Sequence, residues 1–270
     1  MRRRAGWQPR RSRCIASRVR TVFDNIHGLR KAVTMKRGAP QHKPTPNLRS
    51  AGIYSVAEAS ALIGASPQKV RAWVEGWPRT DTPPMIENDL GWVDNQLAFS
   101  FANLMELRFI AFFADANVKI REIRSIMEEV RAQVHRPHPF ATNVVFMTDG
   151  VKIVAEIAHK NGVASLFDLR TKNFEMKDVV YRSLKEGIVY DPAGDAQAWF
   201  PRQLLAPNVI IHPKLAFGRP VLKGTNIPIE AIVDSVRSEG SIEGAAIVFE
   251  ITKRKVEEAV RFDTDLRRAA

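Results

Sequence analysis

The chain has 270 residues, of which 45% are hydrophobic and 26% are charged, and its formal net charge is +12. This length and composition predict a globular protein of about two domains with a sizeable buried core. The most apolar stretch, residues 101–118, is interrupted by Glu106 and Arg108, which argues against a membrane span of about 20 apolar residues. The single cysteine, Cys14, excludes an internal disulfide and a thiolate zinc site, so we expect a cytoplasmic protein.

The excess positive charge lies entirely in the N-terminal segment. Residues 1–50 carry 14 lysines and arginines against one acidic residue, Asp24, whereas residues 51–270 carry 27 basic and 28 acidic residues. Two interpretations stay open: a disordered basic arm that holds nucleic acid loosely, or an upstream extension before a true start at Met35. In both cases residues 1–50 are expected to be an arm and linker, and the folded body begins near Ile53.

The folded body opens with two predicted helices joined by a short turn. Ser55 is a plausible N-cap, and Glu58 stands three residues later, which is the spacing of a capping box. Gly64 is expected to end the first helix, and Pro67 is expected to open the second.

The second helix of this pair presents three polar side chains. Val70 and Trp73 are expected to seat it on the first helix, which leaves Gln68, Lys69 and Arg71 pointing outward. Residues of these types contact phosphates and base edges when a recognition helix enters the major groove of DNA. The alternative is a helical hairpin with a solvated face.

A wing-like segment and two further helices are expected next. Residues 77–99 are rich in turns and contain a short extended piece at Trp92 and Val93, and Ser100 is expected to cap the following helix. The helix after that carries an apolar stripe at helical spacing, formed by Ile120, Ile123, Met127, Val130 and Val134. This order, with LRFI…NVKIREIRSIM, resembles the DNA-binding domain of MerR-type regulators. The resemblance implies that Gln68, Lys69 and Arg71 read the groove and that the wing touches the DNA backbone.

The middle of the chain is expected to form a small mixed sheet with a helix. The runs NVVFMTDGVKIVAEI, residues 143–157, and GIVYDPAGDAQAWFP, residues 187–201, each predict a hairpin. The helix is expected around residues 174–186, between the two hairpins.

No catalytic residue, metal site or cofactor site is predicted. His135 and His138 could be called a metal pair, but Pro137 separates them and no cysteine or ordered carboxylate is expected nearby, so a loop is the better interpretation. In GRPVLKGTNIPIEAIV, Lys223 precedes Gly224, whereas a phosphate-binding loop needs its lysine after the second glycine. Neither a G-x-S-x-G motif nor a Cys/His pair occurs.

The last segment carries the sharpest signal. A short strand, a turn at Gly224 and three helices are expected, with Pro228 in the first turn of the first helix. The pattern His212-Pro213, Gly218, Pro220, Gly224-Thr225…Ile227-Pro228 and V-E-E-A-V-R-F looks like the antitoxin-type domain of bacterial VapB-like proteins. This resemblance covers residues 208–262.

Two basic clusters belong to this segment. Lys253, Arg254 and Lys255 open the last predicted helix, where their side chains and the helix dipole could both meet a phosphate. The alternative is a solvated basic turn. Arg267 and Arg268 are expected to extend freely from the C-terminal end, where they could plug the acidic metal pocket of a toxin.

The combination of both resemblances implies a function. A MerR-like reader joined to this C-terminal domain resembles the larger VapB-type antitoxins, which bind double-stranded operator DNA as autorepressors and neutralise a PIN-like ribonuclease toxin. A homodimer is expected, because paired half-sites add the specificity that one short helix lacks. The rival interpretations are a one-component regulator that senses a small molecule through the middle sheet, and a metal-dependent nuclease.

The expected fold is α+β and mainly helical. A MerR-like winged helix-turn-helix domain is predicted over residues 51–136, a mixed α/β region over residues 137–206, and an antitoxin-type helical domain with a short strand pair over residues 207–270.

Overall fold

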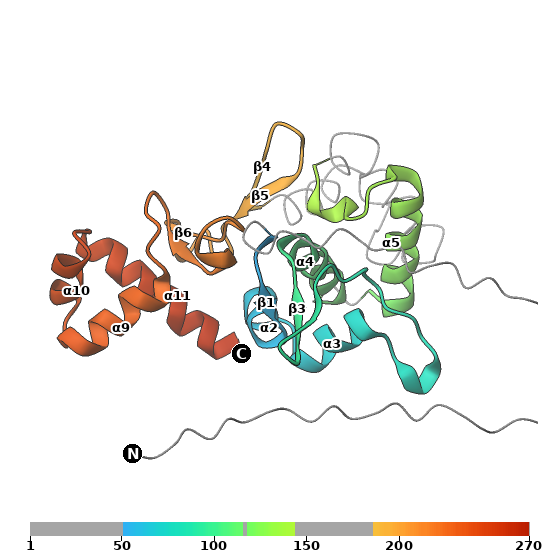
Figure 1. Ribbon diagram of the computed structural model, residues 1–270, viewed down its shortest axis with the longest axis horizontal. Helices are drawn as coiled ribbons and strands as arrows, with labels where there is room; N and C mark the ends of the chain where they lie inside the picture. Colours follow the sequence, from blue (N-terminus) through green and yellow to red (C-terminus); the bar gives the residue numbers. More distant parts are fainter. Residues whose placement is uncertain (1–50, 116–117, 144–185, 270) are drawn as a thin grey trace, which may run out of the picture. The chain divides into compact units, whose positions relative to one another are not determined.

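The computed structural model describes residues 51–115, 118–143 and 186–269 (Figure 1). These residues belong to one compact unit, Pro44–Ala270. Helices dominate, and the strands form small antiparallel sheets, so the predicted mainly helical α+β class is confirmed. No helix of the described ranges combines the length and apolar character needed to cross a membrane.

Some predictions fall outside the described residues. These are the disordered arm, the hairpin of residues 143–157 and the helix of residues 174–186, of which only the end residues Asn143 and Glu186 are described. The three-part domain division also stays a prediction.

The elements follow the chain in this order. The α-helices are α2 (Val56–Ile63), α3 (Pro67–Glu75), α4 (Phe101–Asp115), α5 (Ile120–Val134), α9 (Ile229–Glu239), α10 (Ile242–Val248) and α11 (Lys253–Ala269). The strands are β1 (Tyr54–Ser55), β2 (Gly91–Val93), β3 (Gln96–Phe99), β4 (Ile188–Tyr190), β5 (Ala196–Trp199), β6 (Val209–Ile210) and β7 (Val221–Leu222). Short 3-10 turns lie at Pro78–Thr80, Pro139–Ala141 and Ala216–Gly218.

The first sheet has the order β1-β3-β2 and is antiparallel throughout. Asp94 and Asn95 join β2 to β3 with positive φ angles of 47° and 61°, which suits a two-residue hairpin turn. Trp92 pairs with Leu97 across this hairpin. The extended piece predicted at Trp92 and Val93 is therefore confirmed.

Helices α4 and α5 build much of the core. The Ser100 hydroxyl accepts a hydrogen bond of 3.1 Å from the Asn103 amide, so the predicted cap of α4 is confirmed. The predicted stripe of α5 is buried at Ile123, Met127 and Val130, while its two end residues are half-buried.

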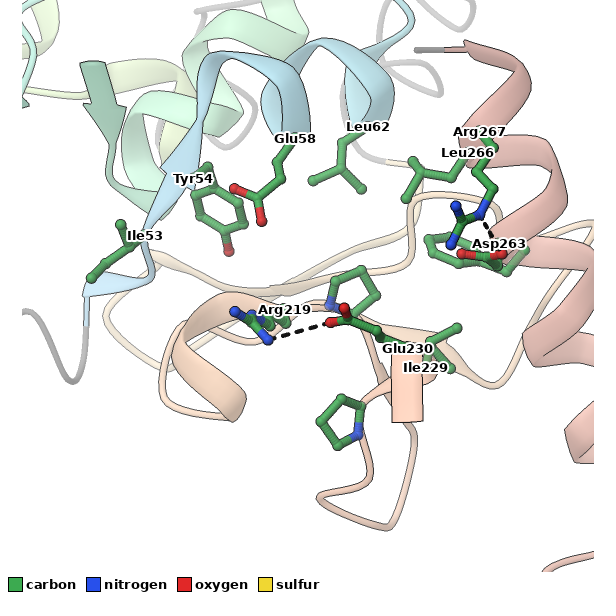
Figure 2. Close-up of a pocket in the computed structure, with 13 residues that line it drawn as sticks. Ile53, Tyr54, Glu58, Leu62, Arg219, Ile229, Glu230, Asp263, Leu266 and Arg267 are labelled. Atoms are coloured by element: carbon green, nitrogen blue, oxygen red, sulfur yellow. Dashed lines mark hydrogen bonds and ion pairs between the residues drawn. The ribbon is translucent and has the colours of Figure 1, made fainter. Parts of the chain in front are cut away.

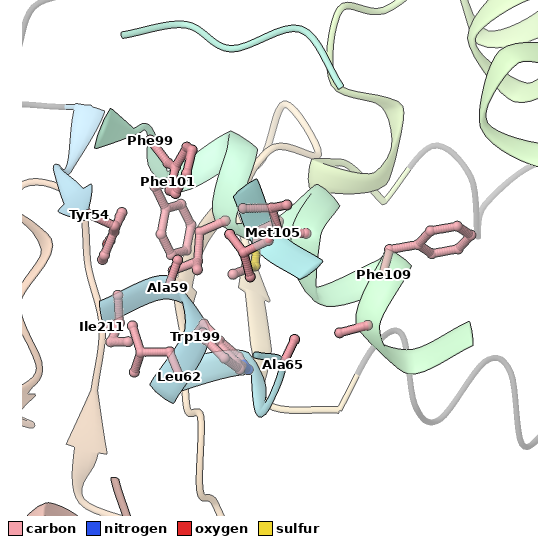
Figure 3. Packing of buried hydrophobic residues seen from close by; sticks show 14 of the residues in the cluster. Tyr54, Ala59, Leu62, Ala65, Phe99, Phe101, Met105, Phe109, Trp199 and Ile211 are labelled. Carbon is pink, nitrogen blue, oxygen red and sulfur yellow. The ribbon is translucent and has the colours of Figure 1, made fainter. Parts of the chain in front are cut away.

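One buried cluster joins residues far apart in the sequence. Trp199 of β5 and Ile211, which follows β6, belong to the same apolar cluster as Ala59 and Leu62 of α2 (Figure 3). Backbone hydrogen bonds of 2.9 and 2.8 Å between Trp199 and Ile211 join these segments. The helix α2 thus shares its core with β5 and with the segment after β6, which lie far from it in the sequence.

The C-terminal elements follow the predicted order. β6 and β7 pair antiparallel, Gly224 follows with a φ of +79°, and α9 begins at Ile229. Pro228 is the N-cap of α9, one position before the predicted first turn. Helices α9, α10 and α11 pack together, so the expected three helices are confirmed (Figure 1). The predicted second hairpin is also confirmed, as β4 and β5.

Candidate nucleic-acid interface

Local hydrogen bonds define α2, the first helix of the candidate interface. The Glu58 amide donates to the Ser55 hydroxyl (3.2 Å), and the Ser55 amide donates to the Glu58 carboxylate (2.8 Å), which completes the predicted capping box. Gly64 ends α2 with a φ of 73°, and its amide donates to the Ser60 carbonyl (2.9 Å). Both predicted ends of α2 are confirmed.

The second helix is fixed by its cap and by its apolar face. Ser66 accepts from the Lys69 amide (3.4 Å), and Pro67 occupies the first turn, where its missing N–H costs nothing. Val70, Trp73 and Val74 are buried. This packing sets the rotation of α3 about its axis, and therefore which side chains it presents to solvent.

The three predicted DNA-binding residues of α3 are all exposed. Gln68, Lys69 and Arg71 lie on the face opposite the buried residues, as the sequence predicted. Neither Lys69 nor Arg71 forms a side-chain ion pair with the described residues. A phosphate could therefore bind these cations without displacing a carboxylate.

The β2–β3 hairpin, which lies in the segment predicted to be a wing, offers an acidic and an aromatic side chain where α3 offers cations. Asp94 stands at its tip and would repel a phosphate, whereas Trp92 on β2 is 60% exposed. The wing contact with DNA stays a prediction.

The second basic cluster lies where it was predicted, at the start of α11, but acidic residues neutralise much of it. The Lys253 ammonium lies 2.8 Å from a Glu243 carboxylate oxygen, and this hydrogen bond keeps the pKa of Glu243 below its usual value. Arg254, which is exposed, lies 3.4 Å from the buried carboxylate of Glu258. Lys255 is half-buried.

The two C-terminal arginines lie in a helix and differ in their partners. Both lie in the last turn of α11, because the helix continues to Ala269. The Arg267 side chain donates to Asp263 (2.7 Å), one turn earlier. Arg268 is exposed and forms no ion pair within the described ranges. Only Arg268 therefore keeps the freedom that was expected of both.

A partly buried ionic cluster around the buried carboxylate of Glu106 was not predicted. The ring of His138 bridges two carboxylates, with Nδ1 at 3.0 Å from Glu106 and Nε2 at 2.9 Å from Asp89. Arg131 also contacts Glu106, at 3.3 Å. Burial would lower the pKa of His138, but the hydrogen bonds and charges of Asp89 and Glu106 outweigh it and raise the pKa to about 9.

This cluster corrects the expectation that no ordered carboxylate lies near His138. His135, by contrast, ends α5 in a left-handed conformation and does not join it. In the described ranges, no group of three metal-binding side chains is suited to a metal ion. The signal for the cluster was Glu106, an acid surrounded by apolar residues in the middle of α4, since a buried charge needs a partner.

No role was predicted from the sequence for Arg202 either. Its guanidinium donates to the carbonyls of Leu62 (3.0 Å) and Ala61 (3.3 Å) at the end of α2, and to Asp265 of α11 (2.6 Å). These contacts connect α2 to the last helix of the chain.

Comparisons with known proteins give distant similarities. Residues 209–262 match a family described as "Protein of unknown function (DUF433)". The chain is 21% identical over 223 residues to a Mycobacterium tuberculosis protein named "Putative antitoxin VapB45", covering 77% of this chain and 92% of that protein. It is 22% identical over 225 residues to "Uncharacterized protein Rv2308" of the same organism, covering 80% and 92%.

A solved structure shares the fold. The crystal structure of Rv2018 from Mycobacterium tuberculosis has a TM-score of 0.59 to this chain at 18% identity, covering 77% of this chain and 96% of that one. The similarity to VapB45 agrees with the predicted resemblance to antitoxins, and the DUF433 match coincides with the segment that carried it. The MerR-like resemblance stays a prediction.

Proposed function

We propose that this protein is an antitoxin that binds operator DNA through α3, represses its own operon and neutralises a PIN-like ribonuclease toxin. The observation that carries the DNA-binding part is the surface of α3. Its two cations, Lys69 and Arg71, are exposed and have no carboxylate partner in the described ranges. A cap and a buried apolar face hold the helix that carries them in place. A rigid helix with free cations is what insertion into a major groove requires.

In this proposal α2 and α3 act as a helix-turn-helix. Gln68, Lys69 and Arg71 lie in the first two turns of α3, and the N-terminal residues of a recognition helix contact base edges. One such helix reads only a few base pairs, so two copies of the chain would bind an inverted repeat as a homodimer.

The toxin-binding part rests on the distant homologue named as an antitoxin and on the end of α11. Metal-dependent ribonucleases hold their metals with carboxylates, so an inhibitor needs a cation that can enter an acidic pocket. Arg268 is exposed in the last turn of α11 and is suited to this role. Arg267 could contribute by exchanging Asp263 for a toxin carboxylate.

The proposed DNA-binding surface of α3 and the proposed toxin-binding end of α11 can be tested separately in the same preparations. The full-length chain would be co-expressed with the adjacent reading frame, and the same preparations would be footprinted on DNA from the operon's own promoter. The double variant Lys69→Ala/Arg71→Ala should lose the footprint but still rescue growth. The double variant Arg267→Ala/Arg268→Ala should keep the footprint and rescue growth less well.

Point substitutions are preferable to truncation of α11. Asp265 binds Arg202, and Phe262 is buried, so removal of the chain end would disturb the contact between α11 and α2. If the unmodified chain neither rescues growth nor co-elutes with the neighbouring product, the antitoxin part of the proposal fails. An unprotected promoter would refute the DNA-binding part.

A further inference from the structure

A cavity of about 260 Å³ lies where α2 meets the C-terminal helices (Figure 2). Its walls are largely apolar, with Leu62 from α2, Ile229 from α9, and Phe262 and Leu266 from α11. Charged side chains from the same elements line it as well. An apolar cavity with a few polar groups is the usual form of a small-molecule site.

One polar group in the wall of this cavity has no hydrogen-bond partner among the described residues. The Tyr54 side chain lines the cavity and is only 2% exposed, and its hydroxyl forms no hydrogen bond with the described residues. Burial, with a contribution from the Glu58 charge, raises the pKa of Tyr54, so the hydroxyl stays protonated. An unsatisfied buried hydroxyl destabilises the fold, because it has lost its hydrogen bonds to water. A ligand that supplies a hydrogen bond would recover this energy.

The position of this hydroxyl is tightly set. Gly52 and Gly218 pack against the end of the Tyr54 ring, and a Cβ at Gly218 would collide with the hydroxyl. Both glycines have positive φ angles, of 69° and 88°, that other residues rarely adopt. The hydroxyl is therefore held in one place, which is a condition for selective binding.

The charges around the cavity are unequally compensated. Glu230 lies 3.3 Å from Arg219, and Asp263 lies 2.7 Å from Arg267. Glu58 accepts hydrogen bonds only from Ser55 and has no cationic partner within the described ranges. The uncompensated negative charge of the cavity thus belongs to Glu58, which lies beside Tyr54 (Figure 2).

We propose that this cavity binds a small organic cation, a protonated amine carrying an apolar body. The ammonium group would donate to the Glu58 carboxylate and to the Tyr54 hydroxyl oxygen, and the apolar body would pack on Leu62, Ile229 and Leu266. An organic anion would fit worse, because both arginines here already have carboxylate partners and Glu58 would repel it. This site goes beyond the proposed antitoxin function and does not depend on it.

The test uses three molecules of equal shape and different charge. Phenethylamine is a cation at neutral pH, 2-phenylethanol is its neutral isostere, and phenylacetate is an anion with the same ring. Each would be titrated into the full-length protein by calorimetry. Phenethylamine should bind, and the other two should bind at least about tenfold more weakly, the worth of one charge-assisted hydrogen bond.

Two variants locate the binding site. Glu58→Gln removes the charge but keeps a residue that completes a capping box, so α2 should stay folded. It should weaken phenethylamine binding at least about tenfold. Tyr54→Phe removes only the hydroxyl and should also weaken it. Glu257→Gln, an exposed acid outside the cavity, is the matched control and should leave binding unchanged.

The proposal fails on any of three results. These are no binding of phenethylamine at millimolar concentration, equal binding of phenylacetate, or an unchanged affinity in Glu58→Gln. Circular dichroism spectra that match the unmodified chain would show that each variant is folded.

Discussion

The starts of α3 and α11 are similar in sequence and differ in their surroundings. α3 opens with P-Q-K-V-R and α11 with K-R-K-V-E-E, so each places cations in its first turns. In α3 the cations Lys69 and Arg71 have no carboxylate partner in the described part of the chain. In α11, Lys253 is paired with Glu243 and Arg254 with Glu258. The number of basic residues in a stretch therefore does not give the charge available to a ligand.

The difference has a simple electrostatic consequence. A phosphate that approaches α3 meets uncompensated cations, whereas a phosphate at α11 must compete with carboxylates already in place. Exposed pairs such as Lys253–Glu243 are weak because water screens their charges, so this competition weakens binding without preventing it. We therefore expect α3 to dominate DNA binding and α11 to add a small contribution.

The largest expected effect comes from α3. Lys69→Ala/Arg71→Ala should lower operator affinity at least about 30-fold, because each cation contributes roughly 1–3 kcal/mol when it reaches a base or a phosphate. Fluorescence anisotropy with labelled promoter DNA would measure this. A loss of less than about threefold, with the variant folded, would remove α3 from the interface.

The partly buried ion pairs of His138 with Glu106 and Asp89 differ from the exposed charges of α3 and α11. The pKa of His138 is raised to about 9, so the protonated ring stabilises the folded state fully below about pH 6.5, and this stability is lost as the pH rises through about 9. The free energy of unfolding should fall by about 3 kcal/mol over this range, because one pKa unit corresponds to about 1.4 kcal/mol. Urea unfolding at several pH values would measure it.

The variant His138→Gln isolates this effect. It should remove most of the pH step, since Gln carries no titratable proton. If the unmodified chain and the variant show the same pH dependence, His138 is not the group responsible. Breaking an exposed pair, such as Lys253–Glu243, should cost far less stability.

The smallest expected effect is at α11. Lys253→Ala/Arg254→Ala should lower DNA affinity only about threefold, since both cations are already partly neutralised. Glu243→Gln, which releases Lys253, should raise affinity slightly if α11 reaches a phosphate. Both changes are measured by the same anisotropy assay. If the α11 double variant loses as much DNA affinity as the α3 double variant, the expected dominance of α3 is wrong.

Much of the fold was predictable because its determinants are local. The cap at Ser55 and Glu58, the end of α2 at Gly64 and the start of α3 at Pro67 each depend on residues within a few positions. The outward direction of Lys69 and Arg71 follows from helical periodicity. The exposure of Gln68, Lys69 and Arg71 was predicted for the same reason, and their contact with DNA stays a prediction.

Tertiary structure alone decided which charged side chains form ion pairs and which have no charged partner in the described ranges. His138 meets Glu106 and Asp89 across 32 and 49 residues of sequence, and Arg202 reaches Leu62 across 140. No periodicity or spacing encodes such contacts, because they depend on how distant segments pack. The sequence by itself determined the helices, their caps and the faces they expose. Only the packing of α2 against the C-terminal helices created the cavity at Tyr54, because its walls come from distant segments.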